Sequence, residues 1–320
     1  MAAIPIWKDK IVEITGTSVR FRIYDSANSI SLYQGVAHAK PGESSVKIRV
    51  NDICADYLVN ALPTLTDRTF TSFALPSFVV QKYSGGSWST IETIQFYNDW
   101  SYDYGFNSDV LSYPINGRVT ADMFILHSQK NITASQSATY TKSNGTSTAK
   151  MITISPTPND GTCVYDAGAV SDTIRINIGL TTYHVVDGCH KYALYYVNAF
   201  GGWDQFLLEG NDMMTDEVTR HIREVEYSNI LLVNRGMDNY VNEIKKTLTL
   251  HSGFLTDDQA SRMHHLLNSP LVYLCLISSG DMIPVIMKTN TCEYKTFSNQ
   301  GNKMVNYTMQ VEIAQNRIRR

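Results

Sequence analysis

The chain has 320 residues, a length that accommodates two or three domains with sizeable hydrophobic cores. Its 27 basic residues nearly balance its 30 acidic residues, so bulk charge predicts neither nucleic-acid binding nor attraction to an anionic membrane. Only 18% of the residues are charged, and 19 are tyrosines. Such a composition suits a surface that is buried against protein partners, although tyrosine content also rises with strand content.

The N-terminal segment, MAAIPIWKDKIVEI, lacks the features of a secretory signal, because its lysines follow a short apolar stretch instead of preceding one. No run approaches the roughly 18 apolar residues that a membrane-spanning helix requires. We therefore expect no membrane span, and synthesis in the cytoplasm with exit by lysis or a specialised route. The odd number and wide spacing of the cysteines favour free thiols there: Cys54, Cys163, Cys189, Cys275 and Cys292.

Residues 1–127 are predicted to form a β-rich N-terminal domain. Apolar and polar side chains alternate with a period of two, which is typical of half-buried strands. A short helical turn is expected at 51–58, opened by Asn51 or Asp52. The predicted strands are 19–24, 46–50, 78–83 and 91–96, and a Ser-Gly-Gly-Ser turn joins the last two into a hairpin.

Residues 128–190 are rich in Ser, Thr, Asn and Gly, with short apolar runs at 150–154 and 173–178. Several short strands separated by turn signals predict a small β-sandwich of immunoglobulin-like size. An alternative is that this region is an insertion between two halves of a larger β-domain.

The third predicted domain, 191–320, begins with the sequence KYALYYVNAFGGWDQFLLEGN. It predicts two strands joined by a tight turn at Phe200-Gly201-Gly202-Trp203, because adjacent glycines allow positive φ without a steric penalty. A helix is expected at about 256–268. Thr256 and Gln259 have the spacing of a capping box, and Pro270 closes the segment.

Strands predicted before and after this helix complete a β-α-β-β-β unit in which one helix packs on an antiparallel sheet. The fold class predicted for the whole chain is therefore mainly β, with several antiparallel β-sandwich domains and a single C-terminal helix.

Motifs of catalysis, phosphate binding or metal coordination are absent from the sequence, so we expect no enzyme, no cofactor and no metal. His264 and His265 are adjacent and would diverge on a helix, which indicates a solvated or rim pair. A looser group, Cys163, His184, Cys189 and His190, lacks the close-spaced pairs of a zinc site. A disulfide between Cys275 and Cys292 would require an oxidising medium.

An aromatic segment at 97–106 interleaves rings with Asp and Asn. It could stack on sugars, or it could anchor a subunit contact. Asp99 and Asp103 are unsuited as a glycosidase pair, since one short segment rarely supplies both carboxylates across a glycosidic bond. The candidate interface or glycan-contact residues are Trp100, Tyr102, Tyr104, Phe200 and Trp203.

Separated segments of the chain resemble structural virion proteins of the tail and baseplate type from Bacteroides phages and prophages. These segments are IPIWKDK (4–10), VNDICADYL (50–58), FYNDWSYDYG (96–105), YALYYVNAFGGWDQFLLEGN (192–211), YVNEIKKTLTLHSGFL (240–255) and EIAQNRIRR (312–320). The resemblance implies a non-enzymatic subunit of a tail or baseplate ring or adaptor. It would be assembled in the host bacterial cytoplasm and located in the virion.

The resemblance also implies that its partners are other copies of itself and other tail proteins. Roles in head-to-tail connection or head decoration stay open within the same class. A second hypothesis is a carbohydrate- or receptor-binding module that contacts a host-surface glycan through the aromatic segment at 97–106. A third is an enzyme acting on polysaccharide, against which the missing acid/base motif argues.

Overall fold

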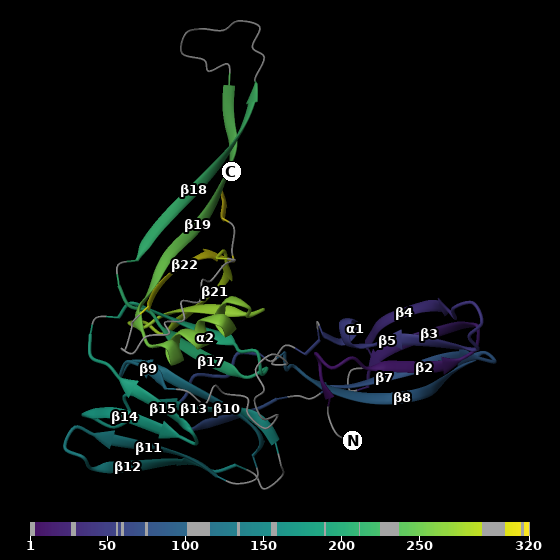
Figure 1. Ribbon diagram of the computed structural model, residues 1–320. Coiled ribbons are helices and arrows are strands. Elements are labelled where there is room, and N and C mark those ends of the chain that lie inside the picture. The colour runs from purple at the N-terminus through teal and green to yellow at the C-terminus, as the bar shows by residue number, and fades with distance from the viewer. Residues whose placement is uncertain are drawn as a thin grey trace, which may run out of the picture.

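The computed structural model of the chain describes residues 4–26, 30–55, 57–58, 61–73, 76–100, 116–132, 135–154, 159–188, 190–210, 212–224, 237–289, 305–314 and 317–319. Strands dominate, and almost all of them pair antiparallel. The predicted fold class is therefore confirmed. An N-terminal unit lies to one side of the molecule, and a long two-stranded arm projects from the other part (Figure 1).

The N-terminal unit consists of a five-stranded sheet in the order β1-β8-β7-β3-β4 and a two-stranded ribbon, β2 with β5. The alternation in the sequence places one face of each strand in a common core that contains Ile14, Phe21, Ile23, Val46 and Phe78. The elements are β1 (Ile4–Pro5), β2 (Ile11–Thr15), β3 (Ser18–Asp25), β4 (Ile30–His38), β5 (Ser45–Arg49), α1 (Asn51–Ala55), β7 (Ser77–Ser84) and β8 (Ser87–Tyr97).

The helical turn predicted at 51–58 is confirmed as α1, but the side chain of Asn51 does more than begin a helix. Its amide nitrogen donates to the carbonyl oxygens of Ile6 and Lys8, and its oxygen accepts from the backbone N–H of Lys10. One buried amide thus fixes the path of the N-terminal segment.

A middle β-sandwich follows, with sheets in the orders β10-β13-β6 and β12-β11-β14-β15-β9. Its elements are β6 (Thr69–Ser72), β9 (Gly117–Val119), β10 (Phe124–Ile132), β11 (Gln136–Lys142), β12 (Ser147–Ile152), β13 (Asn159–Asp166), β14 (Thr173–Ile178) and β15 (Thr181–Val185). The boundary expected at residue 127 falls inside β10. The sandwich also takes in β9 and β6, and β6 precedes the last two strands of the N-terminal unit.

The C-terminal sheet has the order β17-β16-β20-β21-β22-β19-β18, and β23 pairs with β19. The predicted β-α-β-β-β unit is confirmed as β19, α2, β20, β21 and β22. The elements are β16 (Tyr192–Val197), β17 (Trp203–Leu207), β18 (Met213–Glu224), β19 (Met237–Leu255), α2 (Asp257–Leu267), β20 (Val272–Leu276), β21 (Asp281–Met287), β22 (Val305–Ile313) and β23 (Arg317–Arg319).

The capping box that the sequence predicts at the start of α2 is present. The hydroxyl of Thr256 accepts from the Gln259 backbone N–H, and the Gln259 side chain accepts from the Thr256 N–H. Two backbone donors that have no partner within the helix are thereby satisfied.

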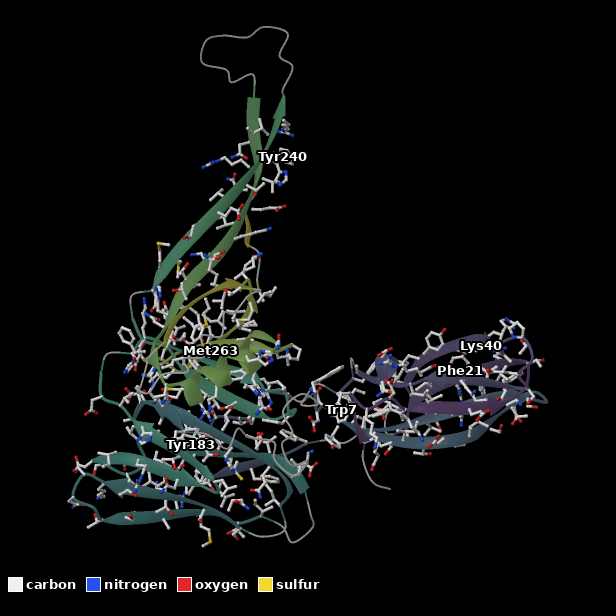
Figure 2. The ribbon with its side chains drawn as sticks, in the orientation of Figure 1. Trp7, Phe21, Lys40, Tyr183, Tyr240 and Met263 are labelled. Carbon is white, nitrogen blue, oxygen red and sulfur yellow. The ribbon has the colours of Figure 1, made fainter. Side chains whose placement is uncertain are left out.

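Both faces of the C-terminal sheet are covered around β16. Ala193, Tyr195 and Val197 point into the core of the middle sandwich, whereas Leu194 and Tyr196 point into the core beneath α2. The side chains labelled Tyr183 and Met263 mark these two cores on opposite sides of the sheet (Figure 2). A strand that is buried on both faces reads as a continuous apolar and aromatic run, as the YALYYV sequence does.

Candidate functional site

The turn between β16 and β17 is the point at which the three parts of the molecule meet. The side-chain oxygen of Asn198 accepts from the backbone N–H groups of Phe200 and Gly202 at 3.0 and 3.1 Å. Gly201 has a φ of 86°, as the hairpin predicted at this position requires. A Cβ at Gly201 would lie 1.9 Å from the Asn98 carbonyl oxygen, so the turn packs directly on the segment that leaves β8.

Hydrogen bonds join this segment to the β16–β17 turn, and join the turn to helix α2. The backbone N–H of Trp100 donates to the Ala199 carbonyl oxygen at 2.6 Å, and the Ala199 N–H donates to Nδ1 of His265 at 3.1 Å. Nδ1 therefore accepts, and the ring is neutral. A chain of hydrogen bonds, the last of them to the side chain of His265, thus links the N-terminal unit, the hairpin turn and helix α2.

A buried ion pair reinforces the same junction. Nζ of Lys130, on β10, lies 3.8 Å from Oδ2 of Asp99, and both side chains are almost completely buried. The ammonium also lies 3.6 Å from the centroid of the Tyr97 ring. In a water-excluded setting, losing either charge would remove from the other a charge that offsets its cost of burial.

A second buried pair joins α2 to β17. Nη1 of Arg262 lies 3.9 Å from Oδ1 of Asp204, and the guanidinium lies over the Tyr183 ring at 5.6 Å. Burial raises the pKa of the Asp204 carboxyl, and Arg262 opposes that shift. Burial also disfavours the charge on Arg262, but Asp204 and Tyr183 raise the pKa of the guanidinium. Gly117 makes room for this group, because a Cβ there would lie 2.5 Å from Nη1 of Arg262.

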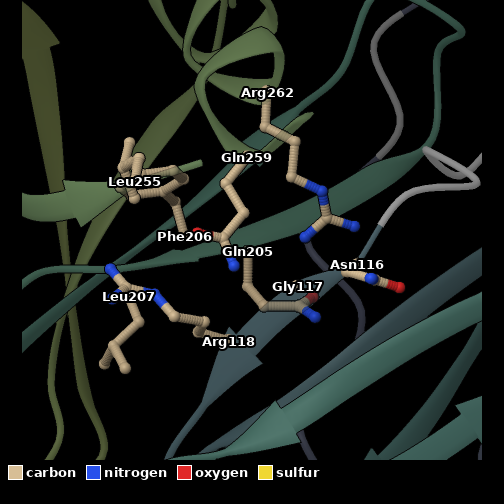
Figure 3. Close-up of a pocket in the computed structure, with 9 residues that line it drawn as sticks. All are labelled: Asn116, Gly117, Arg118, Gln205, Phe206, Leu207, Leu255, Gln259 and Arg262. Carbon is tan, nitrogen blue, oxygen red and sulfur yellow. The ribbon is translucent and has the colours of Figure 1, made fainter. Parts of the chain in front are cut away.

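A small pocket lies beside this pair, between β9, β17 and α2 (Figure 3). Its cavity volume is about 10 Å³, about the space that a single water molecule needs and too small for a small-molecule ligand. Its two guanidinium groups both have carboxylate partners, since Arg118 lies 3.0 Å from Glu209. The pocket therefore offers no uncompensated charge to an anionic ligand. Its lining is Asn116, Gly117, Arg118, Gln205, Phe206, Leu207, Leu255, Gln259 and Arg262.

Two buried histidines border these pairs. Burial, together with the nearby charge of Arg262, lowers the pKa of His127 to about 4. Burial, with His264 and Arg262 nearby, lowers the pKa of His265 to about 3. The solvated histidine pair expected at 264–265 is wrong for His265, because this ring faces the β16–β17 turn instead of solvent.

The arm formed by β18 and β19 projects from the rest of the molecule (Figure 1). Along β18 both faces are open to solvent, and the exposed fractions of Met213, Met214, Val218 and Ile222 are 59, 53, 38 and 59%. Tyr240 lies far along the arm on β19 (Figure 2). Exposed apolar residues grouped on one projecting element mark an interaction surface more often than a free one.

The five candidate contact residues divide into three groups. Trp100 is 46% exposed, and its indole N–H donates to Oδ1 of Asn98 at 2.8 Å. Tyr102 and Tyr104 lie outside the described residues. Phe200 and Trp203 are 1 and 0% exposed. Their assignment as contact residues is therefore corrected, because they are core residues that a glycan or a partner cannot reach directly.

Trp203 instead serves as an internal anchor. Its indole N–H donates to the Ala61 carbonyl oxygen at 3.0 Å, and its ring lies 6.0 Å from that of Tyr273. It fixes the segment that enters the middle sandwich before β6.

Among the described residues, the remaining chemical candidates do not form a cluster that could hold a metal ion. Cys54, Cys163 and Cys275 are buried free thiols. Asp103, Cys189 and Cys292 lie outside the described residues, and so does the disulfide that would need Cys292. Of the looser group of Cys163, His184, Cys189 and His190, only Cys189 lies outside them. The described ranges contain no group of three His, Cys, Asp or Glu side chains that could hold a metal ion.

Sequence reasoning missed the two buried ion pairs. The only local signal was a charge among apolar neighbours, as at Asp204 in the strand WDQFL and Arg262 on the apolar face of the helix. The partner of each charge lies on another element, so neither pair could be assigned from local pattern.

No protein-family model matches the chain, and no curated protein matches it either. Among the helices that the structure describes, none is long and apolar enough to cross a membrane.

Proposed function

We propose that this chain is a non-enzymatic structural subunit of a bacteriophage virion, a ring or adaptor component of the tail or baseplate. It would assemble in the host bacterial cytoplasm with copies of itself or dock on other tail proteins. The resemblance of its separated segments to virion proteins of Bacteroides phages suggests the setting. The arm formed by β18 and β19 is the observation that carries the assembly role.

The arm supports this proposal because, among the described strands, only its base has a third strand, β22 or β23, paired on the other side of β19. Beyond that base it is a two-stranded ribbon, which is at best marginally stable alone in water. Every residue of β18 from 213 to 220 is exposed, and apolar side chains occur on both of its faces. Burial of this apolar surface against another subunit would supply the stabilisation that the ribbon lacks in the single chain. The sheet to which the arm belongs is covered on both faces by hydrophobic cores around β16.

The proposal is tested by the native mass and negative-stain images of the purified protein, together with mass spectrometry of purified virions. A closed ring of a few copies, or the protein's presence in virions at a fixed copy number, is the expected result. A strict monomer that is also absent from virions would overturn the proposal.

A glycan-binding role is the second candidate, and the exposed indole of Trp100 is the observation that favours it. The backbone N–H of Trp7, another exposed tryptophan, bonds to the Asp99 carbonyl oxygen, so both chain segments lie at one junction. Flat rings of this kind stack on sugars. Glycan-array binding that is lost on Trp100→Ala, with thermal stability unchanged, would favour this role.

A further inference from the structure

The outer edge of β18 is a strand edge without a partner among the described residues. β18 pairs with β19 along one side and ends the sheet on the other (Figure 1). A long exposed edge offers its backbone N–H and C=O groups to another strand, and many proteins block such edges. The side chains of β18 decide whether this edge repels or accepts a second strand.

Alternate residues of β18 form a pattern that is complementary to itself. Met214, Asp216, Val218, Arg220 and Ile222 share one face, in the order apolar, acidic, apolar, basic, apolar. When two such strands run antiparallel with Val218 at the centre, Asp216 lies opposite Arg220 of the partner subunit, and Met214 lies opposite Ile222 of the partner subunit. Directly opposed pairs of opposite charge, and of apolar side chains, stabilise a sheet.

Neighbouring registers lose this complementarity. Centring the pair on Glu217 places two carboxylates opposite each other, and centring it on Thr219 places Asp216 opposite the partner's Ile222. If the pairing shifted by a single residue, the face of β18 that carries Met214 would lie on one side of the combined sheet in one copy and on the other side in its partner. The pattern therefore specifies one register.

The same face continues the core of the body. Met214 lies opposite Leu248 on β19, and Leu248 lies opposite Val311 on β22. Leu248 and Val311 are buried beneath α2. Farther along the arm Val218 lies opposite Ile244, so an apolar stripe leads outward from the core onto the exposed ribbon.

We propose that two copies of this chain pair through the outer edges of β18, antiparallel and centred on Val218, so that the two C-terminal sheets form one continuous sheet with the two β18 strands side by side. This inference deepens the proposed function and rests on it only for the biological setting. The contact is two-fold symmetric, and it is compatible with a ring whose other contacts are heterologous. Pairing of two strand edges buries a small surface area, so we expect weak association. It should therefore be measured at high protein concentration.

A charge-reversal pair tests the register. In the proposed register, Arg220→Asp places the new carboxylate opposite Asp216 of the partner subunit. Asp216→Arg places the new guanidinium opposite Arg220 of the partner subunit. Because like charges directly opposite each other destabilise a sheet, each variant alone should self-associate about tenfold more weakly than the wild type. Mixing the two restores both opposite-charge pairs, and a heterodimer is expected in sedimentation of differently tagged chains. Arg175→Asp makes the same change on the exposed strand β14 and should leave association unchanged.

Because Asp216 also lies 3.7 Å from Lys246 of its own chain, circular dichroism of each variant checks that its fold is retained. Unaltered association of Arg220→Asp, or failure of the mixture to associate, would overturn the inference.

Cross-linking gives an independent readout. Val218→Cys places a cysteine of each copy directly opposite the other at the symmetry axis. Their Cα atoms would lie about 4.5–5.5 Å apart, a distance that a disulfide can span. Thr219→Cys is the matched control, because the two thiols are then offset by two residues. Rapid disulfide formation by Val218→Cys alone supports the pairing, and equal rates overturn it. A protein that is present in virions but shows neither effect would keep the proposed function and exclude this contact.

Discussion

At Gly201 the backbone has no room for a side chain. Its φ is 86°, and an added Cβ would lie 1.9 Å from the Asn98 carbonyl oxygen. Gly201→Ala should lower the free energy of unfolding by about 2–4 kcal/mol, because a left-handed conformation is combined with a backbone clash. Gly85→Ala is the control: its φ is 58°, nothing lies within 4 Å, and the loss should be about 1 kcal/mol. Urea denaturation measures both, and equal losses would contradict this account of the junction.

The buried ring of His265 gives the protein a pH-dependent stability. Its pKa in the folded state is about 3, below the roughly 6.5 of an unfolded chain. The unfolded state therefore binds more protons between these values, and stability is lost as pH falls from about 6.5 toward 4. His265→Gln keeps an acceptor for the Ala199 N–H without titrating. As the pH is lowered over this range, the free energy of unfolding of this variant should fall less steeply than that of the wild type. The difference between the two slopes should be about 1.4 kcal/mol per pH unit in urea titrations. Parallel slopes for variant and wild type would contradict the prediction.

The misassignment of Phe200 and Trp203 has a physical reason. Aromatic residues beside a glycine turn suggest an exposed tip, because most hairpin turns lie at the surface. Here the tip is covered by the segment at Asn98–Trp100 and by helix α2. That cover comes from residues distant in sequence, and a pattern within the hairpin carries no information about it.

At the scale of elements, the start of α2 depends on one hydroxyl. Thr256→Ala removes the acceptor for the Gln259 N–H and should destabilise the protein by about 1 kcal/mol. Thr256→Ser retains the acceptor and should lose much less. Thermal unfolding of the two variants at neutral pH tests this, and indistinguishable melting temperatures would show that solvent replaces the cap.

Elements whose signals are local could be predicted from the sequence. The capping box of α2, the β16–β17 hairpin and the alternating strands β3 and β5 all lie where short-range pattern places them. β6 could not be placed in the same way. It pairs with β13, with Thr71 opposite Thr162, and no local feature links positions so distant in the chain.

At the scale of the whole molecule, several of the tyrosines are buried in the hydrophobic cores and do not line the surface. Tyr140 and Tyr195 are buried, and their hydroxyls donate to the carbonyl oxygens of Asp166 and Phe124. A buried tyrosine with a satisfied hydroxyl contributes apolar area without an unpaired polar group. The surface of β18 that we propose as a contact is instead made mostly of methionine, valine, isoleucine and charged side chains.

The distribution of cores predicts how the molecule unfolds. Among the described residues, the core of the N-terminal unit shares no member with the other two cores, whereas those two lie on opposite faces of the same sheet around β16. Calorimetry should therefore show two transitions, one for the N-terminal unit and one for the rest. Ile23→Ala should weaken the first by about 2–5 kcal/mol, and Leu266→Ala should weaken only the second by a similar amount. Coupling across the junction passes through the buried Asp99–Lys130 pair. If each substitution lowered both transitions equally, the N-terminal unit would be part of one cooperative body, and the arm would project from a single rigid scaffold.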